Sequence, residues 1–67
     1  MSYLCTHKIK SMLDEYSMTI SAFCEMCYFS RKRFDRIMAD GDCKLSEIAR
    51  MSDVLDCDES EIREVRQ

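Results

Sequence analysis

The feature that most constrains the fold is the scarcity of turn-forming residues. The 67 residues include one glycine, Gly41, and no proline. A sheet protein needs such residues about every 8–12 positions, so their scarcity favours helices that end on polar caps. Hydrophobic residues make up 46% of the chain, which suits a folded core and excludes a disordered chain. We therefore expect one compact all-α domain spanning residues 1–67.

Apolar residues recur at helical spacing in five segments. We predict helices over roughly residues 3–16, 20–27, 45–55 and 59–65, a third helix that opens after Ser30 and ends near residues 40–42, and no strand. Thr19 and Ser30 are suited to cap the second and third helices, since their hydroxyls can accept orphan backbone N–H groups. Asp58 with Glu61 has the spacing of a capping box before the last helix. Gly41 can adopt a left-handed conformation and end the third helix.

The cysteines indicate a reducing compartment. Their number is odd, five in all, namely Cys5, Cys24, Cys27, Cys43 and Cys57, so they cannot all pair within the chain. We expect buried free thiols and a cytoplasmic protein. A structural zinc site is the competing interpretation, but only Cys24 and Cys27 have its spacing and His7 is alone. No metal, cofactor or membrane span is expected.

Catalysis has little support in the sequence. The chain has no glycine-rich phosphate loop and no Ser/His/Asp set. Cys24 and Cys27 match a dithiol redox motif in spacing only, and such motifs belong to a βαβ context. The protein is therefore not expected to be an enzyme or to take a small-molecule substrate.

Residues 19–38 have the pattern of a helix-turn-helix. The small Cys24 lies in the middle of the second helix, where a close approach is needed, and a short turn leads to a helix rich in cations. Phe34 and Ile37 fall on the apolar face of that third helix and would anchor it. Arg31 and the cations that follow it would project from the other face, where they could enter a major groove about 12 Å wide.

Residues 19–37 resemble the helix-turn-helix of the lambda-repressor/Cro-like family, the xenobiotic-response-element type of small DNA-binding domain. Residues 45–62 resemble the fourth and closing helices of that family. The resemblance implies a five-helix domain that binds double-stranded DNA as a sequence-specific phage or prokaryotic regulator of transcription, acting as a homodimer. The chain departs from the family at Tyr28, which replaces the turn glycine, at Ile20, which replaces a polar residue, and at Ser52, which replaces an alanine.

The resemblance also implies a set of DNA-binding residues. The set comprises Ser30, Arg31, Lys32, Arg33, Asp35, Arg36 and Lys44. Arg31, Lys32 and Arg36 would reach base edges or nearby phosphates. Arg33 would meet a phosphate or only solvent. Asp35 would accept from a cytosine or, the favoured reading, orient Arg31 through an i, i+4 pair.

The remaining two members of this set would bind the DNA backbone. Ser30 would cap the third helix and contact a phosphate, since helix N-termini favour anions. Lys44, in the loop after the third helix, would contact another phosphate. The alternative is that the cations of residues 31–36 only form a solvated helix face. Their position on the exposed third helix of the helix-turn-helix favours the DNA-binding interpretation.

The net charge of −3 does not exclude a nucleic-acid partner. Residues 30–36 hold four cations and one carboxylate, whereas residues 53–67 hold six carboxylates and two arginines. The positive charge is therefore concentrated on the helix expected to face DNA. The alternative function is a protein–protein interaction module on the same fold, antirepressor or antitoxin-like, with Ile20 and Tyr28 at its interface.

Overall fold

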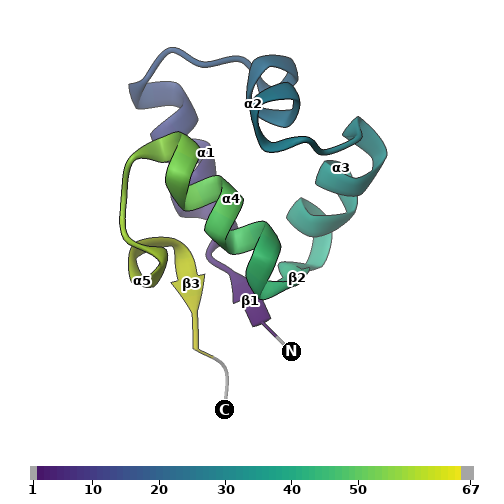
Figure 1. Ribbon diagram of the computed structural model, residues 1–67, viewed down its shortest axis with the longest axis vertical. Coiled ribbons are helices and arrows are strands. Elements are labelled where there is room, and N and C mark those ends of the chain that lie inside the picture. The colour runs from purple at the N-terminus through teal and green to yellow at the C-terminus, as the bar shows by residue number, and fades with distance from the viewer. Residues whose placement is uncertain (1, 66–67) are drawn as a thin grey trace.

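A computed structural model describes residues 2–65 of the chain. Its elements in chain order are β1 (Ser2–Leu4), α1 (Thr6–Glu15), α2 (Ile20–Cys27), α3 (Arg31–Asp40), β2 (Asp42–Cys43), α4 (Leu45–Leu55), α5 (Glu59–Ile62) and β3 (Arg63–Glu64). Figure 1 shows α4 at the centre, with α2 and α3 on one side of it and α5 with β3 on the other. The predicted helical fold with five helices is confirmed, with a small sheet added to it.

The core forms where the apolar stripes of the helices meet. Each helix contributes a fully buried side chain, namely Ile9, Phe23, Ile37, Ile48 and Ile62. The rings of Phe23 on α2 and Phe34 on α3 meet edge to face, with centroids 5.8 Å apart, a favoured aromatic geometry. These contacts join the two helices of the predicted helix-turn-helix.

The expectation that the chain has no strand is wrong. The three short strands form an antiparallel sheet in the order β2-β1-β3. Ser2 pairs with Cys43 on one side of β1, and Leu4 pairs with Arg63 on the other. The sheet therefore brings both ends of the described chain and the segment after α3 together (Figure 1).

The strands also shorten the first and last helices. The first helix, predicted over residues 3–16, begins at Thr6, and the last, predicted over residues 59–65, ends at Ile62. The N–H of Leu4 donates to the Gly41 carbonyl at 2.7 Å, and the N–H of Cys5 donates to the Ile62 carbonyl at 2.7 Å. In a helix starting at residue 3 these two N–H groups would be among the unpaired donors of the first turn, whereas the sheet gives both of them an acceptor.

The predicted caps are confirmed. The Thr19 hydroxyl accepts from the N–H of Ala22 at 3.1 Å, and the Ser30 hydroxyl accepts from the N–H of Arg33 at 3.1 Å. The Glu61 carboxylate accepts from the N–H of Asp58 at 3.1 Å. The boundaries of α2 and α3 are therefore fixed by local side-chain chemistry.

A chain with one glycine still uses four left-handed positions within residues 2–65. Gly41 has φ 79°, and the other three are Ser17 at 53°, Tyr28 at 61° and Asp56 at 53°. A residue with a Cβ in this conformation costs on the order of 1 kcal/mol. Ser17, Tyr28 and Asp56 therefore form turns without glycine, each at this conformational cost.

Most of the sulfur-containing side chains pack in or against the core, as predicted, whereas Cys5 is only partly buried and Met26 is exposed. All five cysteines are free, and Cys24, Cys27 and Cys43 are buried. Burial raises the pKa of the Cys27 thiol to about 11, and likewise raises the pKa of Cys43 to about 11. Met51 is fully buried, while Met12 and Met38 pack against the core.

Candidate nucleic-acid interface

The turn between α2 and α3 keeps a left-handed shape despite its tyrosine. Tyr28 has φ 61° and ψ 36°, and the residue is 85% exposed. The following N–H, of Phe29, donates to the Cys24 carbonyl at 2.9 Å, which closes the C-terminus of α2. Phe29 itself is buried. The bulky residue is accommodated because its side chain points away from the core, into solvent.

The third helix presents one face to the core and the other to solvent. Phe34 and Ile37 are buried, as predicted, whereas Arg31, Lys32 and Arg36 are exposed. A helix fixed by its apolar side cannot rotate freely, so the directions of its cations are set by packing. The structure therefore brings these three predicted residues together on one exposed helix surface.

Arg31 is oriented by its neighbour one turn along α3. Its Nε–H donates to Asp35 Oδ1 at 3.0 Å, across the predicted i, i+4 spacing, and both side chains are mostly exposed. This pair occupies Nε and not the two terminal nitrogens of the guanidinium. An exposed pair of this kind adds little stability, and its effect is to restrict the conformations of Arg31.

The start of α3 borders an open concavity. Ser30, Lys32, Arg33 and Arg36 line this depression, whose volume is about 450 Å³. Three of the four are cations, so the depression suits an anionic ligand. Lys44 is exposed and lies at the N-cap of α4, outside the residues that line this depression.

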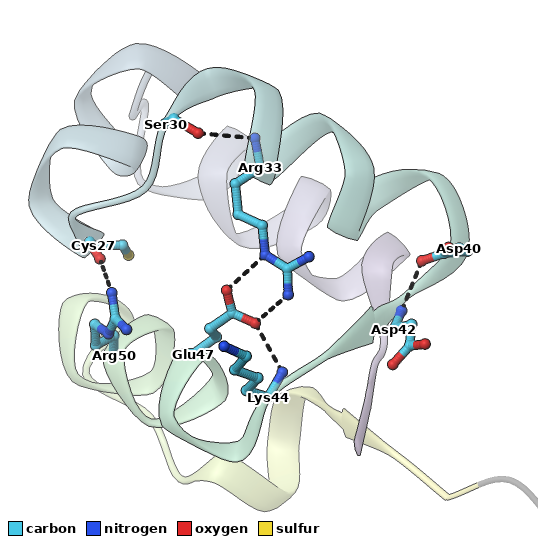
Figure 2. Close-up of polar contacts among 8 residues, drawn as sticks. All are labelled: Cys27, Ser30, Arg33, Asp40, Asp42, Lys44, Glu47 and Arg50. Carbon is cyan, nitrogen blue, oxygen red and sulfur yellow. Dashed lines mark hydrogen bonds and ion pairs between the residues drawn. The ribbon is translucent and has the colours of Figure 1, made fainter. Parts of the chain in front are cut away.

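Arg33 does not extend freely into solvent, and that part of the expectation for it is wrong. Its Nε–H donates to Glu47 Oε2 at 2.8 Å, and its Nη2 donates to Glu47 Oε1 at 2.6 Å (Figure 2). The Glu47 side chain is 7% exposed and that of Arg33 is 35% exposed. Such a bidentate pair is among the stronger polar contacts in proteins.

Glu47 has a second role at the start of α4. Its Oε1 also accepts from the backbone N–H of Lys44 at 2.8 Å, so it satisfies an orphan donor of the helix N-terminus. The Arg33 hydrogen bonds, helped by the bond from Lys44, lower the pKa of Glu47, although burial opposes this. The sequence analysis missed Glu47, whose only local signal is its place three residues after the N-cap of α4.

A second arginine ties α4 to the turn. Arg50 Nη1 donates to the Cys27 carbonyl at 3.3 Å, at the end of α2 (Figure 2). Its guanidinium also lies over the Phe29 ring, 5.5 Å from the centroid, within the range of a cation–π contact. Arg50 therefore contacts the residues immediately before and after Tyr28, the left-handed residue of the turn.

Of the other residues singled out in the sequence, Cys5 and His7 contact each other, with Cys5 Sγ 3.5 Å from His7 Nδ1. Ile20 is exposed at the first position of α2, and His7 is exposed on α1. Among residues 2–65, no three His, Cys, Asp or Glu side chains gather as a metal site would require. No helix in the described part of the chain is long and apolar enough to cross a membrane.

Two packed helices, a tight turn between them and an exposed cationic face on the second define a helix-turn-helix DNA-binding domain. A family model, the Cro/C1-type HTH DNA-binding domain, matches residues 8–66, and the chain belongs to this family. The resemblance drawn from the sequence is thereby confirmed. The chain is a DNA-binding domain of a non-enzymatic family. Searches among curated proteins and among solved structures found no match.

Proposed function

We propose that the protein is a sequence-specific regulator of transcription, of the phage or prokaryotic repressor type, that inserts α3 into the major groove of an operator. It works in the cytoplasm as one domain spanning residues 1–67. The observation that carries the proposal is the division of α3 into a buried face, with Phe34 and Ile37, and an exposed face, with Arg31, Lys32 and Arg36. A major groove about 12 Å wide admits a helix presented in this way.

The exposed residues of α3 have different expected roles. The two terminal nitrogens of Arg31 can donate to O6 and N7 of one guanine while Asp35 holds Nε. Arg36 lies five residues along the helix and reaches a further base edge or phosphate. Lys32 contributes a charge to a neighbouring phosphate, which supplies affinity but no sequence information.

Backbone contacts would fix the position of the domain on the duplex. The N-terminus of α3, capped by Ser30, favours a phosphate because its N–H groups and helix dipole attract anions. Lys44, exposed at the start of α4, is suited to a second phosphate. A homodimer would place one such surface in each of two half-sites about 34 Å apart.

Selection from random-sequence duplexes, followed by anisotropy titration of the selected DNA, tests this function. We expect Arg31→Ala and Arg36→Ala each to weaken binding about 5- to 150-fold and to relax the selected sequence. Lys32→Ala should weaken binding on all sequences and reduce the salt slope by about 1. Measuring the mass of the complex gives the number of protomers on each operator.

Arg63→Ala is the matched control, because Arg63 is an exposed cation on β3, across α4 from α3 in Figure 1. It should bind like the wild type. If Arg31→Ala and Arg36→Ala also bind like the wild type, the proposed function is wrong.

The second candidate is a protein–protein interaction module, favoured by exposed apolar side chains at the two ends of α2, Ile20 and Tyr28. It predicts no selected DNA sequence. It also predicts that Ile20→Ser with Tyr28→Ser removes binding to a protein partner while the fold is kept. Enrichment of one DNA sequence that depends on Arg31 excludes it as the main function.

A further inference from the structure

The buried carboxylate of Glu47 faces α3 and is not itself a group that DNA would attract. It accepts three hydrogen bonds, two from Arg33 and one from the N–H of Lys44. These bonds satisfy a carboxylate that is almost entirely removed from water. If Arg33 turned outward to a phosphate, this buried charge would lose its main partner, which is unfavourable.

Glu47 and Arg50 lie three residues apart on α4, and therefore on one side of that helix. Glu47 holds Arg33 in the first turn of α3, while Arg50 holds the Cys27 carbonyl and the Phe29 ring. Figure 2 shows the contact with the Cys27 carbonyl before Ser30, the N-cap of α3, and the contact with Arg33 after it. The fourth helix thus fixes the segment from which Arg31 and Lys32 project.

We infer that Arg33 is a positioning residue for DNA binding and not itself a DNA contact. Through Glu47 it sets the place of the first turn of α3 in the groove. The inference rests on the proposed function, which it deepens by dividing the arginines of α3 into two groups. Arg31 and Arg36 meet DNA, while Arg33 holds the helix that carries them.

The charges on α3 agree with this division. Lys32 and Arg36 have no carboxylate partner among residues 2–65, and Arg31 has an exposed one. Arg33 has a buried partner that leaves Nε and Nη2 occupied. A cation whose charge is already neutralised releases few counterions on binding. The positioning role and the phosphate role therefore predict different dependences on salt.

The experiment measures the affinity of the full chain for its selected duplex between 50 and 200 mM salt, by anisotropy. The variants are Arg33→Met, Arg33→Lys, Glu47→Gln and the double variant Arg33→Met with Glu47→Gln. We expect each single variant to bind about tenfold more weakly with an unchanged salt slope. The double variant should be little weaker than either single variant, because both remove the same contact.

A phosphate contact by Arg33 gives the opposite pattern. Arg33→Met would then reduce the salt slope by about 0.9, and Arg33→Lys would bind nearly as well as the wild type because it keeps the charge. Glu47→Gln would tighten binding, since it removes a competing carboxylate. Any of these three results overturns the positioning role. Lysine cannot restore the bidentate geometry, so loss of binding in Arg33→Lys supports it.

Ile9→Val controls for lost stability, because Ile9 is fully buried on α1 and the shorter side chain weakens the core. It should bind DNA like the wild type. Circular dichroism confirms that each variant is folded at the assay temperature, and Arg33→Lys and Glu47→Gln remain informative if Arg33→Met unfolds. If Arg31→Ala and Arg36→Ala leave binding unchanged, the proposed function fails and the role of Arg33 fails with it. If those two abolish binding and Arg33→Met lowers the slope, only the positioning role fails.

Discussion

The two ends of α3 are held in different ways. At the N-terminal end the holding groups are side chains, namely the Ser30 hydroxyl, the Arg33–Glu47 pair, and Arg50 of α4, which donates to the Cys27 carbonyl before the turn. At the C-terminal end the N–H of Gly41 donates to the Ile37 carbonyl and the Gly41 carbonyl accepts from the N–H of Leu4, while one side chain, Asp40, accepts from the N–H of Asp42. The N-terminal end of α3, which carries Arg31, is therefore held mainly by side chains, whereas the C-terminal end is held mainly by the backbone of one glycine.

The same contrast appears in the left-handed residue beside each end. Tyr28 precedes α3 and projects its side chain into solvent, whereas Gly41 follows α3 and is buried between the helix and β1. A Cβ is tolerated at the first position, with a conformational cost, because it meets no packed atoms. At the second position a Cβ would add a steric cost to the conformational one.

The largest effect should come from Gly41→Ala. An L-residue in the left-handed region costs roughly 1–2 kcal/mol, and an added methyl group in a packed site costs roughly 1–3 kcal/mol. We expect the free energy of unfolding to fall by about 3 kcal/mol, measured by urea denaturation. Tyr28→Ala places the same residue at the other left-handed position, and its stability should stay close to that of the wild type. Equal losses at both positions would remove the contrast.

The loss of stability on replacing Glu47, which helps to hold the N-terminal end of α3, should be smaller than that of Gly41→Ala and should depend on pH. The pairing with Arg33 lowers the pKa of Glu47 in the folded state. The pair therefore stabilises the fold fully at pH values above 4.5, the ordinary pKa of glutamate. That contribution is lost as the pH falls through the lowered pKa. We expect wild type to exceed Glu47→Gln by about 1–2 kcal/mol at pH 7, with the gap closing in acid.

Glu61→Gln is the matched control for this measurement, since Glu61 caps α5 but is exposed. Its difference from the wild type should be smaller at every pH. A gap for Glu47→Gln that stays constant from pH 7 to pH 2 would show that the charge of Glu47 does not hold this end.

The smallest effect should come from Tyr28→Gly. Glycine relieves a left-handed cost of about 1 kcal/mol but adds about 0.5–1 kcal/mol of unfolded-state entropy to be lost on folding. The free energy of unfolding should therefore rise only slightly, staying within about 0.5 kcal/mol of the wild-type value. A clear loss of stability would mean that the exposed tyrosine ring makes a stabilising contact. The contrast between Tyr28 and Gly41 would then not come from backbone conformation alone.

The sequence was sufficient where structure depends on near neighbours. The helices α2, α3 and α4 were predicted because Thr19, Ser30 and Gly41 act locally and the apolar stripes have a clear period. The pair of Arg31 and Asp35 was found for the same reason, since one helical turn separates them. These features carry most of the candidate DNA-binding face.

Features that depend on distant residues were missed. The strands contain two or three residues each, too few for an alternating pattern to show, and they exist because β1 finds partners far along the chain. Glu47 lies 14 residues from Arg33, so only the packing of α4 beside α3 reveals the pair. Arg31, Lys32 and Arg36 were therefore predicted correctly to be exposed, but the pairing of Arg33 with a carboxylate distant in the sequence was not found.

The pairing of Leu4 with Arg63 has a consequence for the order in which the protein is made. Synthesis runs from the N-terminus, so the helix-turn-helix is synthesised before residues 62–64. Until then β1 lacks its second neighbour, and the core lacks Ile62, which is fully buried in the finished fold. The nascent chain thus contains α3 before it contains the residues that complete the core and the sheet, and folding is completed only when residues 62–64 have left the ribosome.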